Sequence, residues 1–422
     1  MKYKNRLIES KILERQKVIG GLVIEGVKDC GKSTTAKYFS NTILEFQDPD
    51  KSNFYKQIID STPSELLKNP KPILFDEWQN FPKIWNAVRK YIDDNNSKGE
   101  FLFTGSIVKK DNNLHSGTGR ITYLKMYPMS LFEMNESNGT ISLKQLFESD
   151  YSPTPKLCEK NFDKLVFNIC RGGWPSNLII DEENQLLFPK LILENIYKSD
   201  IFEIDGIKGD SNTTKKFLKS YARNICSLAN GKTIMDDVNI TRPTYNSYFQ
   251  ALEKLFVIDE IQGWSFHIRS KNATRMANKR NFVDPSLAVA ALKINPEYLK
   301  TDLNTLGLLF ESLCFREMKI YASTFDAEVK HYRELKGFEI DAVIVLENGE
   351  YGIVECKLGG EEAIKKAIEN LNKFEIQVIE HNLKNSKDKQ KLPKFKMVLT
   401  GLSDLYKTKD NVYVVPITEL KN

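Results

Sequence analysis

Near its N-terminus the chain reads Gly26-Val27-Lys28-Asp29-Cys30-Gly31-Lys32-Ser33, which matches the pattern G-x-x-x-x-G-K-[ST] in full. The apolar run from Gly20 to Ile24 precedes this stretch and predicts a buried strand, and the residues from Lys32 to Ser40 predict a helix. A glycine-bounded loop between a strand and a helix places backbone amides where they can donate to phosphate groups. The stretch therefore predicts an α/β domain that binds a nucleotide.

The residue types in this loop fit ATP and Mg2+ as cofactors. Lys32 is expected to neutralise the outer phosphates, and the Ser33 hydroxyl is expected to hold the magnesium ion. We assign ATP binding to the whole loop and to Thr34, the next residue of the helix. The loop residues are Gly26, Val27, Lys28, Asp29, Cys30, Gly31, Lys32 and Ser33.

Two further short apolar runs, 72–75 and 101–103, each end in polar residues. Asp76 and Glu77 follow the first run, and Thr104 and Ser106 follow the second. Short apolar runs separated by helical segments indicate a parallel sheet, whose carboxyl ends face the ligand. We expect Asp76 to hold Mg2+ with Ser33 and Glu77 to activate the attacking water, while Thr104 and Ser106 sense the γ-phosphate. The alternative is that the acid pair merely begins a surface loop.

Arg120 ends the loop Gly117-Thr118-Gly119-Arg120 and is a candidate arginine finger. It would stabilise the transferring phosphate from its own subunit or from a neighbouring one, and the second case requires a homo-oligomer. A solvated loop arginine is the alternative.

These motifs occur in an order that identifies a family. They are Leu74-Phe75-Asp76-Glu77-Trp78-Gln79, Phe103-Thr104-Gly105-Ser106, Gly119-Arg120-Ile121, Pro128-Met129-Ser130, Gly172-Gly173-Trp174-Pro175 and Asp284-Pro285-Ser286-Leu287. The chain resembles, over nearly its whole length, prokaryotic AAA-type ATP-binding proteins whose C-terminal half is a domain of unknown function. The resemblance implies a AAA core, a winged helix and a restriction-endonuclease-like end with a PD-(D/E)xK-type core.

Because 422 residues are too many for one hydrophobic core, two or three domains are expected. We divide the chain into four parts. Residues 1–150 are assigned to the P-loop AAA-type ATPase core, and 151–208 to a helical lid. Three short amphipathic stretches and two possible strands within 209–295 predict a winged helix. Residues 296–422 are assigned to a mixed α/β, restriction-endonuclease-like domain.

The last part contains a pattern that is typical of metal-dependent nucleases. Glu311 lies on a predicted helix, Asp341 lies on a predicted strand, and Glu355 and Lys357 end the next strand. Such nucleases use carboxylates, here Asp341 and Glu355, to hold magnesium and a lysine to orient or deprotonate water. Charged residues that alternate along an exposed strand would look similar.

The hairpin at Asn348-Gly349 decides whether this site can form. A two-residue loop would place Asp341 opposite Cys356, with Glu355 on the other face of the sheet. A three-residue loop, Glu347-Asn348-Gly349, pairs Leu346 with Glu350 and places Asp341 opposite Glu355. We predict the three-residue loop, because its last position usually adopts a left-handed conformation that favours glycine.

Basic residues cluster at the end of the predicted winged helix and are candidates for contacts with a DNA backbone. They are Arg269, Lys271, Arg275, Lys279 and Arg280. A solvated wing is the alternative, because winged helices also bind proteins.

Composition limits the remaining possibilities. The net charge of +5 is too small to indicate nucleic-acid binding by itself. The 6 cysteines include no C-x-x-C pair, which favours a reducing cytoplasm over a disulfide framework. No run is long enough to cross a bilayer, so we expect a soluble protein without a membrane partner.

Three functions remain compatible with the sequence. The leading hypothesis is an ATPase coupled to DNA binding or Mg2+-dependent DNA cleavage. The alternative is an ATP-dependent switch whose C-terminal domain binds a partner and cuts nothing. A nucleotide-bound scaffold without turnover is disfavoured by Glu77, the residue expected to activate the attacking water.

Overall fold

The computed structural model describes residues 3–105, 116–148, 151–204, 207, 210–228, 230–266, 277–334, 337–385 and 387–422. Within these residues the N-terminal domain contains a 5-stranded sheet in the order β2-β3-β4-β1-β5. All four pairs of neighbouring strands are parallel. The strands are β1 (Gly21–Glu25), β2 (Thr42–Glu45), β3 (Ile73–Asp76), β4 (Phe101–Gly105) and β5 (Ile121–Lys125).

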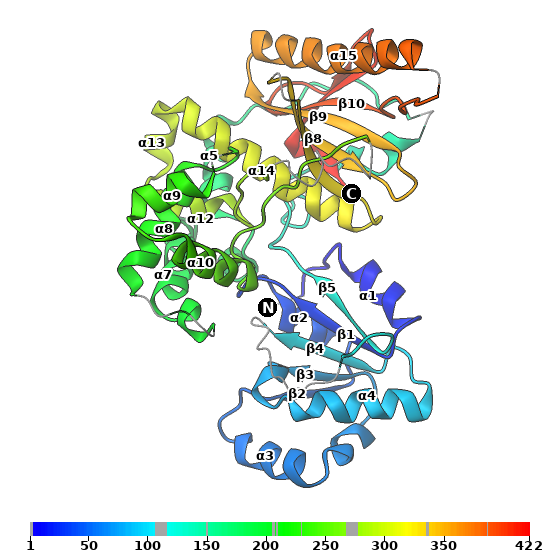
Figure 1. The fold of residues 1–422 in the computed structure, drawn as a ribbon, viewed down its shortest axis with the longest axis vertical. Helices are drawn as coiled ribbons and strands as arrows, with labels where there is room; N and C mark the ends of the chain where they lie inside the picture. Colours follow the sequence, from blue (N-terminus) through cyan, green and yellow to red (C-terminus); the bar gives the residue numbers. More distant parts are fainter. Residues whose placement is uncertain are drawn as a thin grey trace.

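Helices cover both faces of this sheet, which explains why its strands are almost continuously apolar. Val23 and Phe103 lie in the same hydrophobic cluster as Trp85 of α4. Leu22 of β1 points to the other face and shares a cluster with Ile12 of α1. The helices are α1 (Glu9–Gln16), α2 (Lys32–Tyr38), α3 (Ser52–Ser61) and α4 (Lys83–Asn95), in blue to cyan in Figure 1.

A helical region follows the sheet. It contains α5 (Phe162–Arg171), α6 (Glu182–Gln185), α7 (Phe188–Lys198), α8 (Ser211–Arg223), α9 (Gly231–Val238), α10 (Arg242–Lys254), α12 (Pro285–Leu292) and α13 (Pro296–Thr301). Between α10 and α12 the chain pairs with itself at two isolated antiparallel bridges, Ile258 with Phe282 and Ile261 with Lys279. The apolar helix α12 packs against α5, α7 and α8. The ranges 151–208 and 209–295 therefore share one hydrophobic core.

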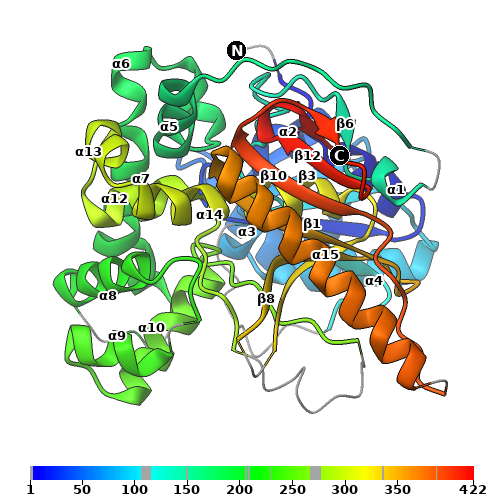
Figure 2. The same cartoon turned by 90° about the horizontal axis from the view of Figure 1, so that it is seen from above.

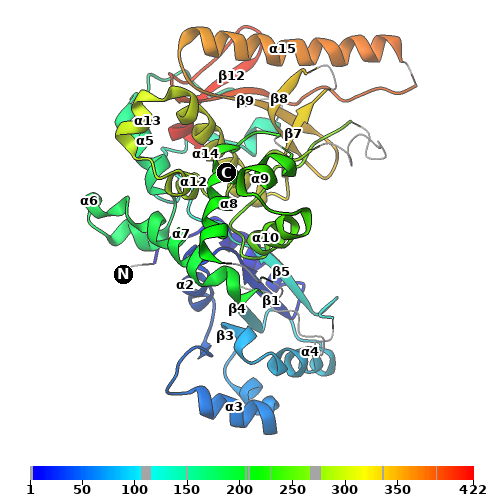
Figure 3. The ribbon, with the colours of Figure 1, turned by 60° about the vertical axis from the view of Figure 1, so that its left-hand side comes forward.

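The C-terminal domain contains a mixed 6-stranded sheet in the order β11-β12-β10-β9-β8-β7. Its strands are β7 (Glu328–Arg333), β8 (Glu339–Val345), β9 (Tyr351–Gly359), β10 (Lys396–Leu402), β11 (Tyr406–Lys407) and β12 (Val412–Pro416). Helix α15 (Glu361–Lys384) crosses one face, as Figure 2 shows from above, and α14 (Leu303–Ser323) lies against the other. Figure 3 shows this sheet and the N-terminal one at opposite ends of the molecule.

The chain end returns to the segment that follows the N-terminal sheet. Strand β13 (Leu420–Lys421) pairs with β6 (Ile141–Ser142), and Glu419 forms an ion pair with Lys156 at 2.9 Å. Part of the range 1–150 therefore packs with the C-terminal domain. Among the described helices, none has both the length and the apolar character that crossing a bilayer requires.

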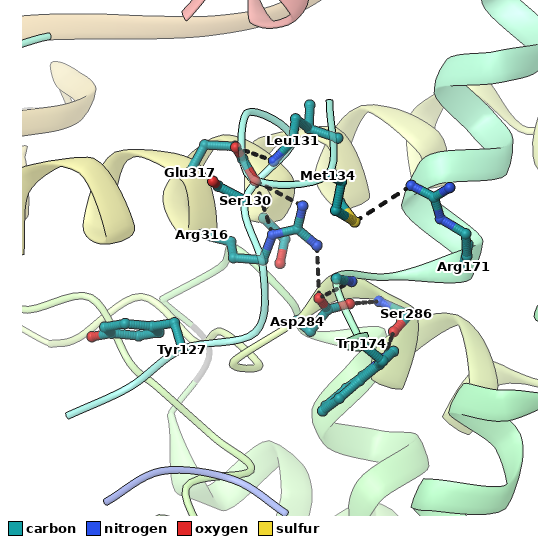
Figure 4. A network of polar contacts seen from close by, with 12 residues as sticks. Tyr127, Ser130, Leu131, Met134, Arg171, Trp174, Asp284, Ser286, Arg316 and Glu317 are labelled. Carbon is teal, nitrogen blue, oxygen red and sulfur yellow. Dashed lines mark hydrogen bonds and ion pairs between the residues drawn. The ribbon is translucent and has the colours of Figure 1, made fainter. Parts of the chain in front are cut away.

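A buried polar network joins the three regions (Figure 4). Arg316 of α14 binds Asp284 and Glu317, each with an N–O distance of 2.7 Å, and all three side chains are fully buried. Asp284 also accepts a hydrogen bond from the Gly173 amide at 3.0 Å. Glu317 accepts one from the Leu131 amide at 2.8 Å. The network thus ties α14 to the helical region and to the segment after the N-terminal sheet.

Candidate functional site

Residues 26–33, which we call the phosphate-binding loop after the predicted role, extend from the end of β1 into the start of α2, as predicted. Gly26 has φ 153°, and a Cβ atom there would lie 2.2 Å from the carbonyl oxygen of Met126. Gly31 is the N-cap of α2 with φ 99°. Both positions require glycine, because an added side chain would clash at the first and would be strained at the second. These glycines let the backbone wrap closely around a ligand.

A cavity of about 560 Å³ opens over this loop. Its walls come from the loop and α2, from Glu77, Gln79 and Asn80, from Tyr3, Lys4 and Arg6 near the N-terminus, and from Pro175, Ser176 and Glu203 of the helical region. The Lys32 ammonium is buried and donates hydrogen bonds to the carbonyl oxygens of Gly26 and Val27, at 2.9 and 2.8 Å. A positive charge therefore lies inside the loop, where phosphate groups would enter.

Asp76 lies at the C-terminal end of β3, beside the start of α2, as predicted. Its side chain is fully buried, and Oδ1 accepts hydrogen bonds from Ser33 Oγ at 2.6 Å and from the Thr104 hydroxyl. Its second oxygen, Oδ2, is buried and has no hydrogen-bond partner among the described residues. Thr104 is thus placed to orient Asp76, and Ser106 lies outside the described residues.

Glu77 lines the cavity beside Asp76. Its backbone has φ 56°, a left-handed conformation that is uncommon for residues other than glycine and that turns the chain sharply at the end of β3. The Gln79 amide donates a hydrogen bond to its carboxylate. Burial raises the pKa of Glu77, and the neighbouring Asp76 carboxylate adds to the rise. A carboxylate with a raised pKa is a better proton acceptor for a water molecule.

Three residues of this site were not predicted from the sequence. Arg6 donates a hydrogen bond to the carbonyl oxygen of Cys30 at 2.8 Å and forms an ion pair with Glu133 at 2.9 Å. Asp200, in the 3-10 helix η5 (Asp200–Glu203), forms an ion pair with Lys28 at 2.7 Å. Tyr3 lines the cavity. No recognisable sequence motif surrounds these residues. The Gly172–Pro175 motif is the sequence signal that could have indicated that the helical region reaches the loop.

Arg120 lies at the opposite end of the sheet from the phosphate-binding loop. It precedes β5, and its carbonyl oxygen accepts a hydrogen bond from the Gly21 amide at the start of β1. Its side chain is partly exposed and forms an ion pair with Asp93 of α4 at 2.6 Å. The structure therefore does not bring Arg120 to the cavity of its own chain, so a finger role would require a neighbouring subunit.

The β8–β9 hairpin has the three-residue loop that the sequence predicts. The Leu346 amide donates a hydrogen bond to the Glu350 carbonyl oxygen at 2.8 Å, and Gly349 has φ 75°. The register continues along the strands and pairs Ala342 with Val354. The predicted register is confirmed.

Beyond the paired residues of this hairpin, Lys357 lies in contact with both Asp341 and Glu355. Lys357 Nζ lies 3.0 Å from Asp341 Oδ2 and 2.7 Å from Glu355 Oε2. The Cys356 amide donates a hydrogen bond to Asp341 at 2.9 Å, and the Asn370 side chain of α15 donates one to Glu355 at 2.7 Å. Asp341 and Glu355 are both buried. We call Glu311, Asp341, Glu355 and Lys357 the acid cluster.

Glu311 of α14 completes the acid cluster through a lysine that the helical region supplies. Lys279 Nζ lies 2.9 Å from Glu311 Oε1 and 3.7 Å from Asp341 Oδ1. Burial, followed by the charge of Asp341, raises the pKa of Glu311 to about 7 and that of Glu355 to about 8. In the described part of the chain, no group of three or more His, Cys, Asp or Glu side chains is arranged to hold a metal ion. Lysine ammoniums fill positions between these carboxylates.

The predicted DNA-contact residues are only partly described, and two of them need a correction. Arg269, Lys271 and Arg275 lie outside the described residues. Lys279 and Arg280 are buried, and Arg280 donates a hydrogen bond to the Tyr245 hydroxyl at 3.4 Å. These two residues lie within the paired segment and are buried, so the structure does not present them to a phosphate backbone.

Family models match three successive parts of the chain. Residues 20–135, which contain β1 to β5 and the phosphate-binding loop, match the AAA domain. The N-terminal domain is an AAA-type ATPase domain. Residues 162–298 and 306–420 match two domains of unknown function, DUF8612 and DUF4143. The first of these models spans both ranges that share the core around α12.

No curated protein matches the chain. Among solved structures, it is similar to a Walker-type ATPase of Pyrococcus abyssi, with 14% sequence identity and a TM-score of 0.41. The alignment covers 68% of this chain and 96% of that one. The assignment of the AAA-type ATPase domain rests on its family model and on the geometry of the phosphate-binding loop.

Proposed function

We propose that the AAA-type ATPase domain binds ATP with Mg2+ and hydrolyses it. The observation that carries this proposal is Asp76 Oδ2, which is buried beside the Ser33 hydroxyl and has no hydrogen-bond partner within the described part of the chain. A buried carboxylate oxygen without a partner is costly. Carboxylate and hydroxyl oxygens are ligands that Mg2+ prefers. The pair therefore fits a magnesium ion chemically.

The residues around the cavity divide the chemistry between them. Lys32 would turn from the loop carbonyls to the phosphates, whose negative charge is the stronger acceptor. Ser33 and Asp76 would hold Mg2+, which when bound neutralises charge that develops on the phosphate oxygens. Glu77 would accept a proton from the attacking water, and its raised pKa favours that step. Thr104 would keep Asp76 in position through their hydrogen bond.

Steady-state ATP hydrolysis at increasing Mg2+ concentrations tests this proposal. We expect Asp76→Asn to lower kcat by roughly 100-fold or more and to raise the Mg2+ requirement. Asp94→Asn is the matched control, because Asp94 is exposed on α4 and pairs with Lys90 at 2.8 Å. Equal kcat and Mg2+ dependence in Asp76→Asn and the wild type would refute the proposal.

We propose Mg2+-dependent cleavage of DNA at the acid cluster as a second function. The contacts of Lys357 favour it, because its ammonium binds both the Asp341 and the Glu355 carboxylate. The two carboxylates have the donor chemistry that Mg2+ requires, and Lys357 would orient or deprotonate the attacking water. Metal binding would require Lys279 and Lys357 to release these oxygens. The assignments of residues 209–295 to a winged helix and of residues 296–422 to a restriction-endonuclease-like domain belong to this second proposal.

Incubation of the full chain with plasmid and linear DNA, with Mg2+ and with or without ATP, tests the second function. Cleavage that Asp341→Asn abolishes and Asp410→Asn preserves is the expected result, since Asp410 is exposed in the same domain. The absence of cleavage under all conditions would favour the ATP-dependent switch, in which the C-terminal domain binds a partner without cutting it.

A further inference from the structure

Lys28 of the phosphate-binding loop is held by the helical region. Its ammonium lies 2.7 Å from Asp200 Oδ1, and Asp200 is buried at the start of η5. Ser199 Oγ also donates a hydrogen bond to Asp200 Oδ1, at 3.1 Å. The Lys28 side chain remains 38% exposed and lines the ATP cavity. It therefore faces both the nucleotide cavity and η5.

The position of Lys28 indicates which part of a nucleotide it would meet. Although burial lowers the pKa of Lys28, the charges of Asp200, Glu203 and Glu77 raise it above its ordinary value. Glu77, Lys28 and Lys32 all line the same cavity. The group expected to activate water therefore lies within reach of both lysine charges. Because that water would attack the terminal phosphate, we expect the Lys28 ammonium to face the γ-phosphate of a bound nucleotide.

Building on the ATP binding proposed above, we propose that Lys28 exchanges Asp200 for the γ-phosphate of ATP, so that ATP, and not ADP, releases η5 from the phosphate-binding loop. A doubly charged terminal phosphate competes well with one carboxylate for the same ammonium. After the exchange, Asp200 would be a buried carboxylate that has lost its cation. Such a group is costly, so η5 would move until Asp200 reaches water.

The contacts of η5 connect this exchange to the rest of the molecule. η5 follows α7, and α7 packs against α12, whose N-cap is Asp284. Asp284 is the residue that binds Arg316 in the buried network. A nucleotide-dependent shift of η5 would therefore be transmitted through α12 to α14, the helix that contains Arg316 and packs against the C-terminal sheet. Lys28 is in this view a nucleotide-contacting residue, and Asp200 is a positioning residue.

Nucleotide affinity distinguishes this exchange from a salt bridge with a purely structural role. We would measure binding of the β,γ-imido analogue of ATP, and of ADP, with Mg2+ by calorimetry. Asp200→Asn removes the competitor and should tighten binding of the analogue about threefold or more. Lys28→Met removes the phosphate contact and should weaken it about tenfold, with ADP affected less than about twofold. Lys37→Met is the matched control, because Lys37 of α2 pairs with Glu45 outside the cavity.

Hydrogen exchange of the backbone amides of residues 199–204 reports on η5 itself. In the wild type, the analogue should increase exchange there several-fold and ADP should not. In Asp200→Asn, exchange should be fast already without nucleotide and should respond to neither ligand. Opposite changes of affinity in the two variants support the proposal. Unchanged analogue affinity in Lys28→Met, or weaker binding in Asp200→Asn, would overturn it, as would equal effects of the analogue and ADP on residues 199–204 in the wild type.

Discussion

Replacing Arg316 with methionine removes the guanidinium that lies between two fully buried carboxylates. Asp284 and Glu317 would lose their cation, although each keeps other donors. Asp284 retains the Gly173 and Ser286 amides, and Glu317 retains the Leu131 amide and the Tyr321 hydroxyl. Removing one partner of a buried ion pair costs about 3–5 kcal/mol. Because the remaining donors still solvate both carboxylates, we expect a loss of about 4 kcal/mol for the pair together, and not twice that amount.

Two further variants test the origin of this loss. Arg316→Lys keeps the charge but cannot bind both carboxylates through a planar fork, so we expect about half the loss. Adding Glu317→Gln to Arg316→Met removes one of the two excess carboxylates and should recover about 1–2 kcal/mol. Arg223→Met is the control, since Arg223 is 61% exposed in its pair with Asp237 and should cost less than about 1 kcal/mol.

Urea unfolding of the full chain, followed by both circular dichroism and tryptophan fluorescence, measures these differences. Coincident transitions would show that a single free energy describes the reaction. A loss below about 1 kcal/mol in Arg316→Met, or no recovery in the double variant, would refute the reasoning that an uncompensated buried charge dominates the cost.

Three other predictions concern hydrolysis and pH. Lys32→Ala should abolish tight ATP binding because it removes phosphate neutralisation, whereas Glu77→Gln should keep ATP binding and lose turnover because it removes water activation. Equilibrium binding and kcat measurements distinguish the two variants. Wild-type turnover in Glu77→Gln would exclude the role of Glu77. Arg120→Ala should slow hydrolysis without weakening ATP affinity, and wild-type specific activity should rise with protein concentration; unchanged kcat would leave Arg120 as a surface partner of Asp93. Burial, with the charge of Lys279, lowers the pKa of His331 to about 4. The stability that the neutral imidazole contributes is therefore fully present above about pH 6.5 and is lost as the pH falls through 4. We expect a loss of roughly 3 kcal/mol of unfolding free energy over that window, which His331→Gln should remove; an identical pH profile in that variant would contradict this.

Much of the ATP site could be predicted because each of its parts is local in the sequence. The phosphate-binding loop needs two glycines with positive φ at a fixed spacing, and these residues, Gly26 and Gly31, lie close together in the chain. Asp76 ends a buried strand and Glu77 directly follows it, and parallel strands bring their carboxyl ends to one edge of the sheet. The register of the β8–β9 hairpin was equally local, because Gly349 alone supplies the left-handed position that selects the loop length.

Other residues were interpreted less well because their environment depends on distant segments. Lys279 and Arg280 belong to a basic stretch, and charge alone favours a solvated or DNA-binding surface. The structure buries both, since Glu311 and Asp341, from a later helix and strand, give Lys279 its partners. Arg120 carries a motif that suggests catalysis, yet the direction of β5 places it at the edge of the sheet away from the loop.

The sequence by itself therefore determined the phosphate-binding loop, the acid pair and the pairing of β8 with β9. Each depends on backbone conformations and side-chain alternation that a few consecutive residues impose. Only the tertiary structure decided that Asp200 holds Lys28, that Arg316 joins three regions and that β13 pairs with β6. These contacts join segments far apart in the chain, and they form because packing of the helices and sheets brings buried charges and strand edges together, where each must find a partner.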